Sequence, residues 1–187
     1  MKKISTLFKK NPEKLALVTN EINPENRRVF DGEGIATRKY DGTAAAIING
    51  QLYKRYDVKK GKQVPPNAIP CQEPDEITGH WPHWVLCDIN KAEDKYFFEG
   101  YNSLAEPDKI ENDTYELVGE KVQNNREKIS GHRLIKHGSK ILSIPALDYD
   151  SLKQYFANPE NDIEGIVFHH PDGRMCKIRK SDFGIKR

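Results

Sequence analysis

Residues 39–57 read KYDGTAAAIINGQLYKRYD, and this stretch decides the fold class of the chain. Its centre is Asn49 followed by Gly50, two residues that tolerate a positive φ. They separate two strand-like runs, Thr43–Ile48 and 51–57. The pattern therefore predicts an antiparallel hairpin with a two-residue turn.

The turn also fixes where the later residues of the hairpin lie. Pairing Ile48 with Gln51 places Arg55 opposite Ala44. We therefore expect Arg55 to return close to the loop that carries Lys39.

Outside the hairpin, the chain shows further strand patterns and few helical ones. The many prolines of 58–80 predict a long loop. A helix start is predicted at 150–154, where Ser151 and Gln154 have the spacing of a capping box. Further strands are predicted at 84–89, 95–98, 114–118, 163–169 and 175–179, with the last two joined by a turn at 171–173. Mostly antiparallel strands with a few helices indicate an α+β fold.

Length and composition limit the class of protein. The 187 residues suit one domain, 1–187, in which residues 1–33 form an N-terminal extension packed on or beside the rest. No apolar run is long enough to cross a bilayer, and no secretory signal follows the first methionine, so no membrane partner is expected. Three cysteines cannot all pair, which favours a reducing, cytoplasmic setting.

The net charge of +2 does not by itself indicate a nucleic-acid binder. Basic side chains nevertheless cluster at 54–62 and 174–187. Clusters that meet at one cleft would suit a polyanion.

Lys39 is the first candidate for chemistry. It precedes Asp41 and Gly42, and that glycine allows a tight turn and a close approach of the backbone to a ligand. A lysine amine can attack the α-phosphorus of a nucleotide and hold it as a phosphoramidate. It must be neutral to do so, so we expect neighbouring cations or burial to lower its pKa.

Five later side chains complete the candidate site, and they follow Lys39 in chain order. Strand alternation places two of them, Lys177 and Arg179, on one face of a strand, where they could bind a triphosphate and lower the pKa of a nearby lysine. The full set is Arg55, Glu116, Glu164, Lys177 and Arg179.

The position of Glu164 depends on the loop that follows its strand. An even-numbered loop puts Glu164 on the face of Lys177 and Arg179, whereas a three-residue loop separates them unless a bulge intervenes. Pro171 disfavours the tightest turn, so we expect a loop of about four residues. A carboxylate on that face could hold Mg²⁺ against phosphate oxygens.

These residues and their order resemble the motifs of the covalent nucleotidyltransferase superfamily, which contains ATP-dependent DNA and RNA ligases and mRNA-capping guanylyltransferases. Residues 39–42 resemble the nucleophile motif, Arg55 and Glu116 lie in the next two, and 164–167 and 177–179 resemble the last two. Within the superfamily, the run EGIVFH at 164–169, the Asp172-Gly173 pair, His137-Gly138 and the helix at 151–156 resemble the RNA ligase 1 family.

The resemblance implies an antiparallel-sheet-rich, ATP-grasp-like ligase adenylation domain and a three-step reaction with ATP and Mg²⁺ or Mn²⁺. Lys39 would take AMP from ATP, pass it to an RNA 5′-phosphate, and a 3′-hydroxyl would then displace it and seal the strand. By the same resemblance Arg55 would contact the phosphate or the RNA end, Glu116 the ribose hydroxyls, and Glu164 the metal. Lys177 and Arg179 would bind near the α-phosphate. The partners would be single-stranded or nicked RNA ends, with a monomer favoured.

The chain departs from relatives that continue into an OB-fold domain, for which no room is expected after residue 187. That argues against a capping enzyme and most DNA ligases, although a minimal DNA ligase or a guanylyltransferase stays open as an alternative. A non-catalytic module that binds RNA ends is a second alternative. No clear aromatic follows Glu116 to stack on adenine, and Tyr115, Phe97 or Val167 could replace it.

Residues 71–87 permit two further interpretations. Two cysteines and two histidines could form a zinc site, although their spacing fits no standard pattern: Cys71, His80, His83 and Cys87. Trp81 and Trp84 could stack on unpaired bases or could belong to the core.

Overall fold

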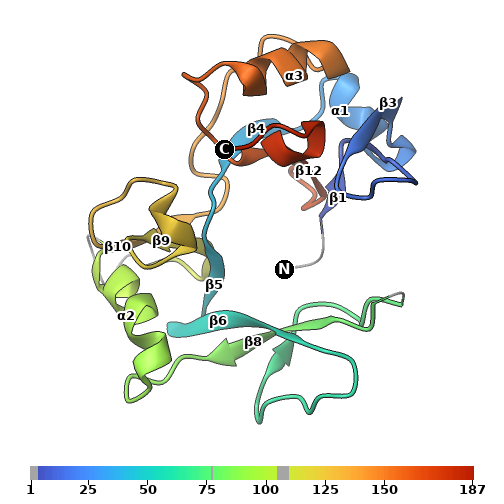
Figure 1. The fold of residues 1–187 in the computed structure, drawn as a ribbon. Coiled ribbons are helices and arrows are strands. Elements are labelled where there is room, and N and C mark those ends of the chain that lie inside the picture. Colours follow the sequence, from blue (N-terminus) through green and yellow to red (C-terminus); the bar gives the residue numbers. More distant parts are fainter. Residues whose placement is uncertain (1–3, 77, 105–109) are drawn as a thin grey trace. The chain divides into compact units, whose positions relative to one another are not determined.

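The computed structural model describes residues 4–76, 78–104 and 110–187 (Figure 1). The described chain divides into two compact units. We call Asp41–His137 the inserted unit, because it interrupts the other in sequence. The second, which we call the terminal unit, consists of Ile4–Tyr40 and Gly138–Arg187.

The terminal unit is built on a four-stranded sheet of order β1-β12-β11-β4. Its strands are β1 (Ser5–Thr6), β4 (Ile35–Lys39), β11 (Gly165–His169) and β12 (Met175–Arg179). The pairs β12–β11 and β11–β4 are antiparallel, whereas β1 runs parallel to β12. Around the sheet lie the hairpin β2 (Phe8–Lys10) and β3 (Val18–Ile22), the helices α1 (Arg27–Phe30) and α3 (Tyr149–Ala157), and the 3-10 turns η1 (Pro24–Asn26) and η5 (Lys180–Phe183).

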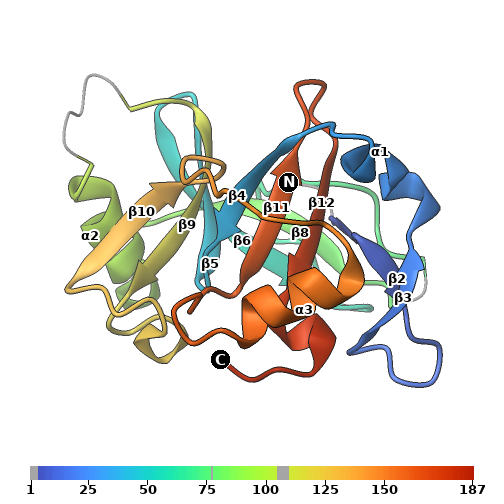
Figure 2. The ribbon, with the colours of Figure 1, turned by 90° about the horizontal axis from the view of Figure 1, so that it is seen from above.

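One face of this sheet is apolar and the other is not. Ile166, Phe168, Cys176 and Ile178 point into a core that also contains Leu152 and Phe156 of α3, so the helix covers that face (Figure 2). Because successive strand residues point to opposite faces, the odd-numbered residues of the same strands lie on the other face. In β4, β11 and β12 these residues include Thr37, Lys39, Gly165, Val167, Lys177 and Arg179.

The inserted unit has a six-stranded sheet of order β10-β9-β5-β6-β8-β7. In chain order its strands are β5 (Thr43–Ile48), β6 (Gln51–Val58), β7 (Ile69–Pro70), β8 (Trp81–Leu86), β9 (Asp113–Gly119) and β10 (His132–Lys136). The helix α2 (Lys95–Asn102) covers one face, where Phe97 packs with core residues of β5, β6 and β9. The turns η2 (Ala92–Asp94) and η4 (Gln123–Asn125) complete the unit.

The predicted hairpin is confirmed. Ile48 pairs with Gln51, and Asn49 and Gly50 have φ values of 51° and 73°, as a two-residue turn between twisted strands requires. The long loop predicted for 58–80 begins after Val58, the last residue of β6, and among its described residues the short β7 is the one strand. The last two strands lie close to their predicted bounds, and the α+β class is confirmed.

Three local predictions differ from the structure. Residues 95–98 form the first half of α2 rather than a strand, because Phe97, Gly100 and Tyr101 recur at helical spacing and bury one side of the segment. The helix predicted from residue 150 begins at Tyr149, and its cap is Asp148, whose carboxylate accepts the Ser151 amide at 2.9 Å. The predicted strand 84–89 is shifted, since β8 ends at Leu86.

Among the described residues, no helix combines the length and apolar character that crossing a bilayer demands.

Candidate functional site

Lys39 lies at the end of β4, in contact with Glu164. Its Nζ is 2.5 Å from Oε2 of Glu164, and both side chains are roughly three-quarters buried, with exposed fractions of 25% and 21%. Glu164 immediately precedes β11, whose first residue, Gly165, pairs with Lys39. The two side chains are therefore brought together by the pairing of β4 with β11, although 125 positions separate them in sequence.

Gly165 separates Lys39 from Arg179 in the same row across the sheet, because it pairs with both. A Cβ at residue 165 would lie 2.5 Å from the carbonyl oxygen of Ile178 and 3.2 Å from Cγ of Arg179. A side chain there would displace the neighbouring strand or the arginine. The glycine thus allows β12 and the Arg179 side chain to pack closely at this position of the sheet face.

Lys177 lies on the same face, in the next row. Burial, and to a smaller extent the positive charges of Arg179 and Lys39, lower its pKa to about 8 against the opposing effect of Asp182 and Glu164. An ammonium group held among other cations, with no ion-pair partner in the described residues, is suited to bind an anion. The expected cationic pair is therefore present, together with the carboxylate and the candidate nucleophile.

The loop between β11 and β12 is odd-numbered, whereas the sequence predicted an even-numbered loop of about four residues. His169 pairs with Met175, and the His170 amide bonds the Arg174 carbonyl, which leaves Pro171, Asp172 and Gly173 as an odd-numbered loop. Strand alternation alone would then put Glu164 on the core face. Glu164 instead occupies a bend before β11 begins, outside the pleat, and its side chain turns to Lys39.

Asp182 is a site residue that sequence reasoning missed. It is fully buried and accepts hydrogen bonds from Arg179 through Nη2 at 2.9 Å, Nε at 3.4 Å and the backbone amide at 2.9 Å. Lys10 of β2 donates to the same carboxylate at 2.7 Å. Burial acts to raise the pKa of Asp182, but the bonds from Arg179 and Lys10 outweigh it, so the pKa lies below its ordinary value. Asp182 therefore stays ionised and fixes the guanidinium of Arg179.

Glu116 is held in the inserted unit by His137, a second residue whose role the sequence did not give. Nε2 of His137 lies 2.9 Å from Oε2 of Glu116, and Nδ1 lies 2.9 Å from Oγ1 of Thr114. Because an ionised carboxylate only accepts, the Nε2 must carry a proton, and the imidazole links Glu116 to β9 at a second point. The carboxylate is consequently fixed in direction.

The glycine of the 39–42 motif has a clear steric reason. A Cβ on Gly42 would lie 2.2 Å from the carbonyl oxygen of Leu117 and 2.9 Å from Cγ of Glu116. Only glycine lets the chain enter β5 so close to β9. In the same segment, Asp41 accepts a hydrogen bond from Arg126 at 3.1 Å.

Arg55 lies on β6, and its Nε donates to Asp57 at 3.1 Å. Strand alternation places it on the sheet face of Glu116, opposite the face covered by α2.

Of the predicted site residues, the structure brings Lys39, Glu164, Lys177 and Arg179 together in the terminal unit. Arg55 and Glu116 share a face of the inserted unit.

The three candidates for stacking on adenine are in different places. Tyr115 and Phe97 belong to the core beneath α2 and are not available on the face of Glu116. Val167 lies in the terminal unit, on the face of Lys39 and Lys177. Of the three candidates it is the one that shares a sheet face with Lys39.

Within the described residues, the cysteines and histidines of 71–87 do not form the zinc site that the sequence permitted, and the tryptophans pack or bond within the protein. Trp84 is buried with Ala46 and Tyr53, and Trp81 donates its Nε1 proton to the Gln72 carbonyl at 2.6 Å. Across the described residues, no three histidine, cysteine or acidic side chains gather in a way that could hold a metal ion. Burial raises the pKa of Cys87 to about 12, so this thiol is held protonated.

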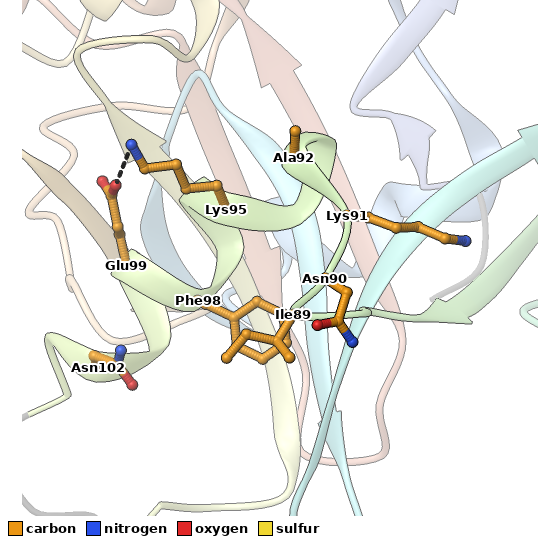
Figure 3. A pocket seen from close by; sticks show the side chains of 8 residues that line it. All are labelled: Ile89, Asn90, Lys91, Ala92, Lys95, Phe98, Glu99 and Asn102. Atoms are coloured by element: carbon orange, nitrogen blue, oxygen red, sulfur yellow. Dashed lines mark ion pairs between the residues drawn. The ribbon is translucent and has the colours of Figure 1, made fainter.

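A separate hollow of about 400 Å³ lies beside α2 and the loop before it (Figure 3). None of the predicted site residues lines it, and Lys95 there pairs with Glu99 at 3.7 Å. Its lining is formed by Ile89, Asn90, Lys91, Ala92, Lys95, Phe98, Glu99 and Asn102.

Comparison with known proteins gives one family name. A family model described as RNA ligase 1 matches residues 101–187. Rat and mouse proteins named RNA ligase 1 are each 26% identical to the chain, over 220 and 224 residues, which cover 81% of this chain and 67% of each relative. An orangutan (Pongo abelii) protein of that name is 35% identical over 79 residues, 38% of this chain and 24% of its own length.

The chain thus spans 67% of the length of the rodent relatives and 24% of the orangutan one. The family-model match includes Glu116, Glu164, Lys177 and Arg179, and Lys39 lies before it. The resemblance predicted from the motifs is confirmed: this chain resembles the RNA ligase 1 family.

Proposed function

We propose that this protein is an ATP-dependent RNA ligase that joins a 5′-phosphate to a 3′-hydroxyl through a covalent lysyl-AMP intermediate. The observation that carries the proposal is the arrangement of the terminal unit: a lysine at a strand end, a carboxylate 2.5 Å from it and two further cations on one sheet face. The names of the RNA ligase 1 relatives support RNA as the substrate.

In the first step, Nζ of Lys39 attacks the α-phosphorus of ATP. A nitrogen–phosphorus bond forms, the bond to the bridging oxygen breaks, and pyrophosphate leaves with the electron pair. Attack requires a neutral amine, so Lys39 must first lose its proton. Lys177 and Arg179 supply fixed positive charge where negative charge grows on the phosphate oxygens.

Glu164 fits the role of a magnesium ligand. Mg²⁺ is usually bound through one or two carboxylates together with substrate phosphates and water, so a single carboxylate beside a phosphate site suffices. When bound, the ion would neutralise charge on the phosphate oxygens. Glu164 also orients Lys39 through their ion pair.

In the second step AMP passes from Lys39 to the RNA 5′-phosphate, and the lysine is released. In the third, a 3′-hydroxyl attacks that phosphate, a phosphodiester forms, and AMP leaves. Glu116, fixed by His137, would accept hydrogen bonds from the ribose hydroxyls of the nucleotide. Arg55 would exchange its contact with Asp57 for a phosphate of the RNA end.

The test is sealing of a 5′-phosphorylated RNA in the presence of ATP and Mg²⁺, compared with nicked DNA and with GTP in place of ATP. We expect RNA to be sealed with ATP, and AMP to appear on the RNA 5′ end when the 3′-hydroxyl is blocked. Preferential sealing of DNA would assign a DNA ligase, and labelling by GTP a guanylyltransferase. Binding of RNA ends with no covalent nucleotide would assign a non-catalytic module.

A further inference from the structure

Lys10 reaches the site from the N-terminal hairpin, far from every motif that predicted the site. It follows Phe8 and Lys9 on β2, and it points to the same side of the strand as Phe8 because side chains alternate. Phe8 is buried against Phe183 of η5, with ring centroids 6.5 Å apart. This packing brings the end of β2 to η5, where Nζ of Lys10 lies 2.7 Å from Asp182.

Asp182 therefore joins two cations on one carboxylate. Its Oδ1 accepts from Nη2 of Arg179 and from Lys10, while its Oδ2 accepts from Nε and the backbone amide of Arg179. The carboxylate is fully buried, whereas the Lys10 and Arg179 side chains are 30% and 32% exposed. Both cations keep N–H donors that no described residue accepts.

The net charge around Asp182 indicates that Lys10 does more than pack within the terminal unit. With Arg179 alone, the Asp182 carboxylate would cancel the positive charge that a phosphate needs. Lys10 restores one positive charge at the same point, so that Lys10, Arg179 and Lys177 together exceed Asp182 by two charges. A buried carboxylate that orients two partly exposed cations is suited to hold an anion between them.

We propose that Lys10 is a further phosphate-binding residue of this site and that Asp182 positions it together with Arg179. The inference rests on the proposed function and extends it, since it makes the N-terminal hairpin part of the substrate site. The phosphate is either the pyrophosphate portion of ATP or the 5′-phosphate of the RNA, and separate assays distinguish the two.

The experiment compares wild type with Lys10→Ala and with Lys9→Ala as the matched control. Lys9 is the preceding residue of the same strand, but it points away and pairs with Glu21 at 2.7 Å. Self-adenylylation against ATP concentration tests the first source of phosphate. Transfer from pre-adenylylated protein, against the concentration of 5′-phosphorylated RNA, tests the second.

We expect Lys10→Ala to raise the half-saturating concentration in one arm by about tenfold, the usual effect of losing a charge-assisted hydrogen bond. Lys10→Arg should recover most of the loss, and Lys9→Ala should stay within about twofold of wild type. An effect on ATP alone assigns the pyrophosphate, and an effect on RNA alone assigns the RNA phosphate. Equal half-saturation for Lys10→Ala and wild type in both arms overturns the inference.

Failure of the proposed function gives a different result. If wild type takes no label from ATP, the ligase proposal fails, and binding of inorganic tripolyphosphate by calorimetry still tests Lys10. Weaker binding by Lys10→Ala than by Lys9→Ala would keep it as a phosphate residue, and equal binding would remove it. Asp182→Asn, read by the same titration with thermal unfolding alongside, should weaken binding in parallel with Lys10→Ala.

Discussion

The two units share an architecture but carry different sets of candidate site residues. Each has a sheet whose one face is buried by a helix and whose other face carries the candidate site residues. In the terminal unit that face is charged, with Lys39, Lys177 and Arg179 set against Glu164 and the buried Asp182. In the inserted unit Glu116 is held by the imidazole of His137, and the other ring nitrogen of His137 bonds the hydroxyl of Thr114.

Under the proposed function, the terminal unit would carry the chemistry and the inserted unit would orient the nucleotide. A face with several cations suits phosphates that gain charge in a transition state, whereas one fixed carboxylate suits neutral hydroxyls. In both units a glycine lets a strand approach a site residue. A Cβ added to Gly165 would lie 2.5 Å from the carbonyl oxygen of Ile178. A Cβ added to Gly42 would lie 2.2 Å from the carbonyl oxygen of Leu117.

The largest effect that would sharpen this comparison is expected for Glu164→Ala. Loss of the carboxylate removes both the partner of Lys39 and the proposed magnesium ligand, so the adenylylation rate at saturating ATP should fall by about a hundredfold. Binding of ATP should change much less. The matched control is Glu33→Ala, a carboxylate of the same unit that pairs with His170, and it should stay within about twofold of wild type. Magnesium titration curves that coincide for Glu164→Ala and wild type would contradict the metal role.

A smaller effect is expected for His137→Ala, which tests the inserted unit. Without the imidazole the Glu116 side chain is free to rotate, so the KM for ATP should rise by about five- to tenfold while kcat changes less. The cleanest measurement is a double-mutant cycle with Glu116→Ala. If His137 acts through Glu116, its removal in the Glu116→Ala background should have no further effect. Additive losses would show that His137 acts on its own.

The smallest effect is a pH dependence of phosphate binding in the terminal unit. The pKa of Lys177 is lowered to about 8, first by burial and then by Arg179 and Lys39, so its charge is present below that pH and lost above it. Affinity for pyrophosphate should therefore weaken by a few-fold as the pH rises from about 7 to about 9. Lys177→Arg should show a flatter profile, because an arginine keeps its charge throughout this range. Identical profiles for the two proteins would exclude Lys177 as the titrating group.

Local sequence signals predicted the hairpin and the strands of the site. Asn49 and Gly50 specify their turn without help from distant residues, and the alternation around Lys177 and Arg179 places both on one face. Short apolar segments were less informative. The short apolar segment 95–98 does not by itself distinguish a strand from a helix. It forms part of α2 because that helix buries its apolar side against β9 and β10.

The remaining site residues depend on contacts that no local pattern encodes. Lys10 and Asp182 are 172 positions apart, and they meet because β1 pairs with β12 and Phe8 packs against Phe183. Glu164 reaches Lys39 from a bend before β11, whereas the sequence prediction placed it with Lys177 and Arg179 through an even-numbered loop that the structure does not have. His137 was noticed only as part of a family resemblance, and its bond to Glu116 follows from the return of the chain after β10.

The most direct test of the account is incubation with α-³²P-ATP and Mg²⁺, wild type beside Lys39→Ala, followed by a denaturing gel and peptide mapping. The account predicts a covalent AMP on wild type, released by acid and mapped to Lys39, and no label on a Lys39→Ala protein that unfolds at the same temperature. Intact mass of the purified wild type identifies protein that already carries AMP, which pyrophosphate should remove before labelling. Normal labelling of Lys39→Ala would contradict the assignment of the nucleophile and with it the proposed mechanism.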